Sequence, residues 1–428
     1  MAEVLTVVEH ESVPILPSRA SEQKTLGQKH AVLLEKLEKK LPAKAWSWGN
    51  REIKFASYCG VISLGDLSIE ILPKIYGREA EDHGSSRNAL IRMLSKARYL
   101  KLHEVNTAGI SPQKRNLLDV FILHFCERLR IQLACGMIRK YTRREKNLNV
   151  LRGKLKVDQQ LRRNLVHQER LFCQYDELSA DNTYNQILKY VLGILLKAAT
   201  GNRAFQQVSE LHTRFELVDD SVADILTLDS LSFDRLTERY KPIFDQCRYF
   251  LEGFYPDVVA GKKNCLSLLF DMNRLFEAYV AAELRKDARR QNLRLREQGP
   301  FKYFARLENS GESVFGMRPD ISFTDRNNNP VMIADAKWKI LDEGEKNLGI
   351  SQADMYQMGS YASRYGVKSL ALVYPRQERL TEPVYMTLEG TDVRLLVQPI
   401  DISYHSPARA RAILSFLSSS SLSETSAS

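Results

Sequence analysis

The sequence lacks the segments that mark membrane and secreted proteins. Its 428 residues contain no apolar run of about 18, and the opening MAEVLTVVEHESVPILP has no basic flank before an apolar stretch. We therefore expect neither a signal peptide nor a membrane span. It also lacks any C-x-x-C pair and any histidine at zinc spacing from a cysteine pair, so we expect reduced, mostly buried thiols in a cytoplasmic protein. The six cysteines are widely spaced, at Cys59, Cys126, Cys135, Cys173, Cys247 and Cys265.

A nucleotide-binding loop is also missing. The pattern G-x-x-x-x-G-K-[ST] cradles phosphates and needs its lysine. Residues 344–351, GEKNLGIS, have the glycine spacing, but Ile350 stands where the lysine belongs. Any nucleotide-driven motor that works with this protein must therefore be another chain.

The composition is that of a globular protein, with 44% hydrophobic and 27% charged residues. The length predicts two or three domains, each able to bury a substantial core. The formal charge of +10 is a modest excess. It is compatible with a polyanionic partner but does not by itself predict one.

The order of sequence patterns predicts a multi-domain α/β protein. Residues 1–84 read as a β-rich unit, because two alternating apolar runs flank the hairpin signal Gly65-Asp66. Residues 85–255 show helical spacing, with Asp181 or Asn182 as the N-cap of one helix. After a Pro- and Gly-containing break we expect a third domain at 265–414, and the serine-rich end at 415–428 is expected to be disordered.

A basic segment interrupts the helical region at residues 138–157. We predict a hairpin or projecting loop there. Three interpretations stay open: a partner-binding projection, a solvated basic loop, or a contact to DNA phosphates, which would weaken steeply with salt. Its cations are Arg139, Lys140, Arg143, Arg144, Lys146, Arg152, Lys154 and Lys156.

The stretch RPDISFTDRNNNPVMIADAKWK carries two acids at the ends of apolar runs that flank a turn signal. If the hairpin is symmetric about the Asn327–Asn328 bond, Asp320 faces Asp335. Opposed residues have Cβ atoms roughly 4.5–5.5 Å apart, and like charges there destabilise the pair. We therefore expect a positive group between them, and a slip of one residue would remove the arrangement.

A hard divalent cation such as Mg²⁺ suits that position, because it binds through one or two carboxylates and keeps other oxygens around it. Lys337 projects from the same strand face as Asp335. A cation, a water and an ammonium at one place suit the hydrolysis of a phosphodiester. The alternative is that all three are surface charges at frayed strand ends.

This pattern resembles the PD-(D/E)xK nuclease superfamily. Pro319-Asp320 is followed by fourteen residues and then by Asp335-Ala336-Lys337. The resemblance implies a nuclease domain at 265–414, with a mixed sheet flanked by helices. It also implies an acid from the preceding helix, for which Glu277 and Glu283 compete, as a further metal ligand. Gln357 and Tyr361, four apart on one helix face, match a Gln-x-x-x-Tyr motif of one branch of the superfamily.

Within that superfamily the chain resembles the McrC-like family, the nuclease subunits of modified-cytosine restriction systems. Several segments appear in the family's order: NALIRMLSKA, LRGKLKV, YDELSADNTYNQILKYVLGILL, DMNRLFEAYV, RPDI, DAKWK and SQADMYQMGSYA.

This resemblance implies an Mg²⁺-dependent DNA endonuclease that works with a hexameric, McrB-like AAA+ GTPase on double-stranded DNA carrying modified cytosine. It also implies that residues 85–255 bind the partner, with the basic projection entering or capping the ring. A stand-alone repair or recombination nuclease, and a non-catalytic DNA-binding adaptor of an AAA+ ring, are the alternative functions.

Overall fold

The structure is a computed structural model. It describes residues 3–18, 23–41, 44–75, 83–97, 116–167, 169–258, 265–339, 341, 346–377, 380–402 and 413–416. Most of the predicted disordered tail, and part of the break before residue 265, lie outside these residues. No helix among the described residues is long and apolar enough to cross a membrane.

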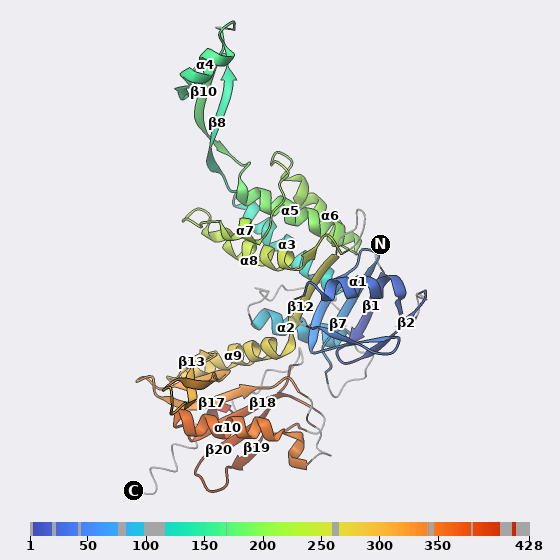
Figure 1. The fold of residues 1–428 in the computed structure, drawn as a ribbon, viewed down its shortest axis with the longest axis vertical. Helices are drawn as coiled ribbons and strands as arrows, with labels where there is room; N and C mark the ends of the chain where they lie inside the picture. The colour runs from blue at the N-terminus through green and yellow to red at the C-terminus, as the bar shows by residue number, and fades with distance from the viewer. Residues whose placement is uncertain are drawn as a thin grey trace. The chain divides into compact units, whose positions relative to one another are not determined.

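The chain is a mixed α/β protein (Figure 1). It divides into two compact units, each made of three segments of the sequence. The first contains Met1–Val4, Val61–Ser68 and Asn116–Leu268, and the second contains Leu5–Gly60, Ile69–Arg115 and Leu269–Ser428. The predicted four-part division remains a prediction.

The predicted β-rich start is confirmed, although the sequence analysis missed the amphipathic helix α1, Gln28–Glu38. A five-stranded sheet has the order β1-β7-β6-β12-β11, and a four-stranded sheet has the order β3-β2-β5-β4. The strands are β1 Glu3–Val8, β2 Ser12–Leu16, β3 Leu26–Gly27, β4 Trp46–Trp48, β5 Glu52–Phe55, β6 Tyr58–Ser63, β7 Leu67–Leu72, β11 Phe254–Tyr255 and β12 Cys265–Asp271. The predicted Gly65 turn joins β6 to β7, with Leu64 N donating to Leu67 O at 2.7 Å.

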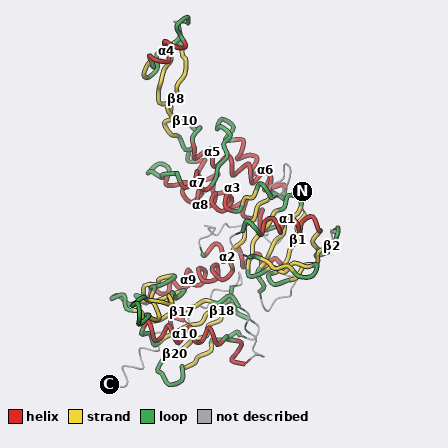
Figure 2. The backbone as a smooth tube through the Cα atoms, in the orientation of Figure 1, coloured by secondary structure: helices red, strands yellow, loops and turns green. Residues whose placement is uncertain are grey.

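The predicted helical region is confirmed (Figure 2). Its helices bury apolar faces. Asn182 is the N-cap of α5, where its side chain accepts a hydrogen bond from Asn185 N. The helices are α2 His83–Lys96, α3 Leu117–Ala134, α5 Thr183–Ala198, α6 Asn202–Thr213, α7 Ile225–Asp229 and α8 Lys241–Glu252, with the 3-10 turn η2 at Glu238–Tyr240.

The basic segment forms a projecting hairpin in the first unit (Figure 1), as predicted, but the hairpin continues beyond the predicted end at residue 157. β8, Lys140–Leu148, pairs along its whole length with β10, Leu171–Ser179, whereas the run after Gly153 forms only the short β9, Lys154–Leu155. Helix α4, Val157–Arg163, lies between β9 and β10 in the chain. The hairpin therefore extends to Ser179, because β10 supplies the longer alternating run.

The second unit contains a six-stranded mixed sheet in the order β13-β16-β17-β18-β20-β19. β17, β18 and β20 are parallel neighbours, and the remaining pairs are antiparallel. β14 and β15 form a separate two-stranded hairpin. The strands are β13 Arg294–Glu297, β14 Lys302–Arg306, β15 Ser313–Met317, β16 Ile321–Thr324, β17 Pro330–Ala336, β18 Ser369–Pro375, β19 Val384–Thr387 and β20 Arg394–Ile400.

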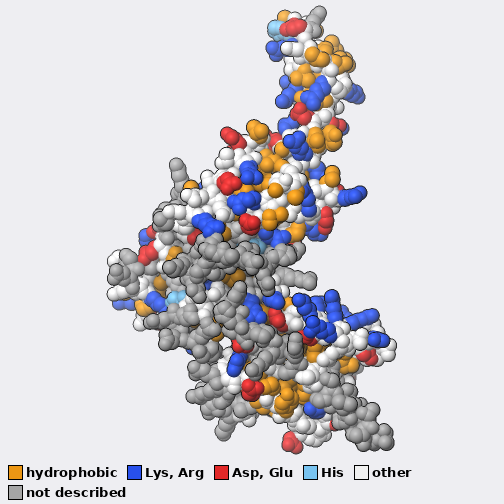
Figure 3. Space-filling model, turned by 180° about the vertical axis from the view of Figure 1, so that it is seen from behind, with side chains coloured by type: hydrophobic (Ala, Val, Ile, Leu, Met, Phe, Trp, Pro, Cys, Tyr) orange, Lys and Arg blue, Asp and Glu red, His pale blue; other side chains and the backbone are white. Residues whose placement is uncertain are grey.

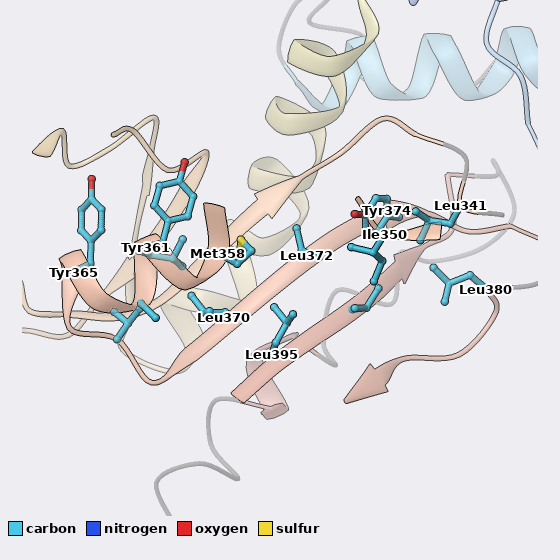
Figure 4. Packing of buried hydrophobic residues seen from close by; sticks show 14 residues of the cluster. Leu341, Ile350, Met358, Tyr361, Tyr365, Leu370, Leu372, Tyr374, Leu380 and Leu395 are labelled. Carbon is cyan, nitrogen blue, oxygen red and sulfur yellow. The ribbon is translucent and has the colours of Figure 1, made fainter. Parts of the chain in front are cut away.

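Two helices pack on this sheet. α9, Met272–Arg290, begins at the N-cap Asp271, and α10, Gln352–Tyr365, begins at the N-cap Ser351. Met358 and Tyr361 of α10 join one buried cluster with Ile333 of β17 and with residues of β18 and β20 (Figure 4). The short 3-10 turn η3, Lys346–Gly349, precedes α10. The expected mixed sheet flanked by helices is therefore present.

Gly153 provides a test of how the projecting hairpin is built. Its φ of +68° is left-handed, and a Cβ there would lie 2.4 Å from Gln174 O and 2.7 Å from Tyr175 Cβ. Gly153→Ala should therefore loosen the hairpin, accelerating hydrogen exchange of the β10 amides by about tenfold or more. Gly193→Ala, at a helical position with nothing within 4 Å of the new Cβ, is the matched control. Equal protection in both variants would contradict this account of the turn.

Candidate functional site

Asp320 and Asp335 occupy opposed positions at the open end of the β16–β17 hairpin. Ile321 pairs with Ala334, and the same register continued by one residue sets Asp320 against Asp335. This is the predicted register, and its one shift lies beside the turn. Asp320 Oδ2 also accepts a hydrogen bond from Ala336 N at 3.0 Å, which fixes its carboxylate on the neighbouring strand.

Burial raises the pKa of both aspartates. Asp335 is only 1% exposed. Burial raises the pKa of Asp320 to about 8, with Asp335 and then Glu277 adding to the shift. Burial also raises the pKa of Asp335, although the Lys337 ammonium opposes it. The pair therefore cannot easily carry two negative charges without added positive charge.

Lys337 supplies one positive charge to this pair. Its Nζ lies 2.7 Å from Asp335 Oδ2, and it donates a hydrogen bond to Gln357 Oε1 at 3.1 Å. Burial would lower the pKa of Lys337, but Asp335 and Asp320 outweigh burial and raise it. Lys337 therefore stays charged at neutral pH.

The predicted Gln357 and Tyr361 motif lies directly behind Lys337. Gln357 Nε2 donates to the Tyr361 hydroxyl at 3.0 Å, and that hydroxyl donates to Arg318 O at 3.2 Å. Tyr361 is also a core residue of α10 (Figure 4). The hydrogen bonds thus connect the Lys337 ammonium, through two side chains of α10, to the backbone of Arg318, two residues before Asp320.

The structure separates the two candidate helix acids. The pKa of Glu277 is raised by burial and then by Asp335, so its carboxylate belongs to the electrostatic neighbourhood of the aspartates. Gln298 Nε2 donates to it at 2.8 Å. Glu283 instead pairs with Lys96 at 3.3 Å. Of the two, Glu277 is therefore the one placed to act with the pair.

Asp354 is a buried acid that the sequence analysis did not single out. Its carboxylate lies 2.9 Å from Lys339 Nζ and 3.8 Å from Lys337 Nζ. Burial alone would raise its pKa, but the Lys339 and Ser351 hydrogen bonds outweigh burial and lower it. Ser351-x-x-Asp354 is the spacing of a helix capping box, which is the signal that could have identified it.

Trp338 links the segment just after β17 to the N-terminal β segment. Its indole N–H lies 3.0 and 3.1 Å from the two carboxylate oxygens of Glu9, and Lys74 N donates to the same group at 2.9 Å. Phe276 of α9 packs edge-on against the indole, with 5.4 Å between the two ring centroids. Burial raises the pKa of Glu9 to about 7. The residue after Lys337 is therefore held from two directions.

The donor set suits a hydrated divalent cation rather than a closed metal cage. Within the described ranges, no group of three His, Cys, Asp or Glu side chains is arranged to hold a metal ion. Asp335 Oδ2 is nevertheless buried and has no hydrogen-bond partner in the described part of the chain, its ionic contact to Lys337 aside. Two carboxylates and open coordination positions fit Mg²⁺, which retains several waters.

The predicted contact residues of the basic segment lie on the projecting hairpin of the first unit. Most of them pair with nearby acids: Arg143 with Asp176 at 3.9 Å, Arg144 with Asp181 at 3.3 Å, and Arg152 with Glu177 at 3.2 Å. Arg139 and Lys154 are exposed. Much of the positive charge counted in the sequence is therefore balanced locally.

Asp320→Asn tests the charge repulsion in the metal-free protein. The pKa of Asp320 is near 8 when folded and 3.8 unfolded, so this group stabilises the fold most at low pH and loses that contribution as pH rises through 8. Asparagine keeps the shape and removes the titration. We expect the variant to gain stability over wild type, by on the order of 2 kcal/mol, between pH 5 and pH 8.5 in EDTA. Parallel pH profiles in chemical denaturation would contradict the assigned repulsion.

Two solved structures share the fold of this chain. A chain in a half-complex from the tetradecameric assembly of Thermococcus gammatolerans McrB AAA+ hexamers with bound McrC matches with a TM-score of 0.73 and 19% identity, covering 96% of this chain and 98% of that one. A chain in the Thermococcus gammatolerans McrBC complex matches with a TM-score of 0.52 and 22% identity, covering 66% and 88%. At these identities the likeness shows a common fold.

A search of curated proteins gave no match. The family model described as McrBC 5-methylcytosine restriction system component matches residues 53–375, which is well over half of the sequence. The chain therefore belongs to the McrBC 5-methylcytosine restriction system component family.

Proposed function

We propose that this chain is the DNA-cleaving subunit of a modification-dependent restriction complex and hydrolyses phosphodiester bonds with Mg²⁺. One observation carries the proposal: two opposed, largely buried aspartates share a site with a charged lysine. A structural role alone would favour apolar residues at these positions, because burying like charges destabilises a fold.

Asp320 and Asp335 would hold the cation, with Glu277 placed to assist. When bound, Mg²⁺ supplies the positive charge that activates water and stabilises the pentacovalent phosphate. Lys337 is positioned by Gln357 and can donate to a phosphate oxygen as negative charge develops there. Tyr361 restricts the Gln357 side chain through its hydroxyl. Lys337 therefore stays oriented before DNA arrives.

We further propose that a McrB-like AAA+ GTPase ring is the partner, that this chain stimulates its nucleotide hydrolysis, and that the substrate is double-stranded DNA with modified cytosine. The solved structures most relevant here are complexes with McrB AAA+ hexamers. The absence of a complete phosphate-binding loop in this sequence agrees with a motor on another chain.

The tip of the projecting hairpin is the surface we propose for ring binding. The last β8–β10 pair is Leu148 with Leu171, so residues 149–170 form the tip. The tip exposes several apolar side chains in a small space, which is typical of a protein-binding surface. They are Val150, Leu151, Val157, Leu161, Leu165 and Val166. Since the cations below the tip are largely paired with acids, a protein partner fits this hairpin better than DNA phosphates.

Asp335→Asn tests the cleavage assignment. We expect the complex to lose DNA cleavage by about a thousandfold or more in Mg²⁺, as EDTA does for wild type, because a cation ligand is gone. Partner binding and partner GTP hydrolysis should be unchanged. Asp392→Asn removes an exposed acid paired with Lys368 and is the matched control. Cleavage that survives Asp335→Asn would disprove the site, and cleavage by the wild-type chain without a partner would favour a stand-alone nuclease.

Leu165→Asp with Val166→Asp tests the docking surface. Charges on these exposed positions should weaken binding to the AAA+ ring about tenfold or more, and abolish GTPase stimulation, without unfolding the chain. Leu217→Asp, at a side chain 91% exposed in the same unit, is the control. Binding can be followed by sedimentation with the nucleotide-bound ring. Unchanged affinity would exclude the tip as the docking surface.

A further inference from the structure

The second unit carries a dense basic segment that the proposed chemistry does not use. Residues 285–296 contain six Lys or Arg and one acid, Asp287. They cover the end of α9 and the edge strand β13. Lys and Arg gather there in the space-filling view (Figure 3). We call Lys286, Arg289, Arg290, Arg294 and Arg296 the basic strip.

Much of this positive charge is available to a ligand. Arg290 pairs with Asp287 at 2.9 Å, and Arg294 donates to Asn328 Oδ1 at 2.9 Å. Lys286, Arg289 and Arg296 are exposed and make no ion pair with any described residue. This differs from the projecting hairpin, where five of the eight cations pair with acids of the hairpin or of the neighbouring segments. The strip is therefore the better match for a polyanion.

An aromatic hairpin follows the strip in the chain. β14 and β15 pair with Lys302 opposite Met317, and four aromatic side chains remain exposed on or beside them. Phe315 is 74% exposed and has φ of +58°, a conformation that is rare for a bulky residue. A strained, exposed aromatic next to a candidate active site indicates a functional role. The exposed rings are Phe301, Tyr303, Phe304 and Phe315.

The strip and the aromatic hairpin are fixed to the active-site segment. Gln298 N, just after β13, donates to Asp320 O at 2.8 Å. Tyr365 of α10 donates to Pro300 O at 2.6 Å, and Arg364 donates to Tyr303 O at 2.6 Å. Only two residues separate the end of β15 from Asp320. A nucleic-acid strand bound to this surface would therefore have a fixed position relative to Asp320.

We propose that the basic strip and the aromatic hairpin form the DNA-binding surface of this unit. The strip would contact the phosphate backbone, and the exposed rings would stack on bases or press into a groove. Unpaired cations beside exposed aromatic rings are the pattern that nucleic-acid surfaces show. A surface for a second protein copy would not need so many unneutralised arginines. The inference rests on the proposed nuclease function, which supplies DNA as the polyanion.

The test uses the full chain and fluorescence anisotropy with a duplex in Ca²⁺, where binding is measured without cleavage. The strip variant is Lys286→Ala with Arg289→Ala and Arg296→Ala. We expect affinity at about 150 mM salt to fall tenfold or more, and the slope of log affinity against log salt to shrink by about 2–3. Lys36→Ala with Lys39→Ala and Lys54→Ala removes the same charge from exposed positions elsewhere and should change neither quantity.

The aromatic hairpin is tested by Phe304→Ser with Phe315→Asn. Asparagine tolerates positive φ, so the hairpin should keep its fold. We expect affinity to fall about tenfold at every salt concentration, with the salt slope unchanged, because stacking is lost and phosphate contacts remain. Circular dichroism and thermal melts should match wild type.

Several outcomes would overturn the proposal. Affinity and slope equal to those of the charge-matched control would remove the strip from DNA binding. Loss of self-association instead of DNA binding, seen by sedimentation, would identify the surface as an interface between copies. The proposed catalytic function is tested separately. The Asp335→Asn variant should still bind DNA in Ca²⁺. Cleavage that survives in this variant would disprove the active site but not the DNA-binding surface.

Discussion

The opposition of Asp320 and Asp335 is the constraint on which the second unit depends. Hairpin register forces two acids together where burial raises the pKa of both. Their repulsion opposes folding, so the surrounding structure must hold them in place. Lys337 offsets part of this repulsion and leaves room for further positive charge. Because two negative carboxylates repel each other when no cation is present, the site is well suited to bind one.

The supports of this pair come from distant parts of the chain. β17 is buried among neighbouring strands, which keeps Asp335 rigid. On α10, Gln357 and Tyr361 link Lys337 to the backbone before Asp320. Glu9 and Phe276 fix Trp338. Each of these contacts holds a residue that lies in the site or next to it. The positions of Asp335 and Lys337 are therefore restricted from several directions.

The sequence predicts what local periodicity controls and misses what long-range packing controls. The predicted register at the Asp320 end of the hairpin is correct, although the ladder shifts between Phe323 and Thr324, so the turn itself is not symmetric about the Asn327–Asn328 bond. The contact between Glu9 and Trp338 joins residues 329 positions apart, and no local sequence pattern predicts it. The full extent of the basic hairpin, beyond the predicted end at residue 157, was missed for a similar reason: the strand that pairs with β8 begins after the intervening helix α4. Periodicity cannot choose between two alternating runs when their pairing partners are unknown.

The number of Lys and Arg residues in a segment also does not predict whether their charges are free to bind a polyanion. The projecting hairpin and the basic strip look alike in the sequence, since both concentrate Lys and Arg. In the structure, acids of β10 lie across the hairpin from its arginines. In the strip, Lys286, Arg289 and Arg296 are exposed and make no ion pair with any described residue. Ion pairs formed within a surface already satisfy the cations, so phosphates gain less by replacing those partners. These observations are the reason we propose the apolar tip of the hairpin for a protein partner and the unneutralised charge of the strip for DNA. Two basic segments can thus serve different partners, and cross-strand pairing rather than composition decides which.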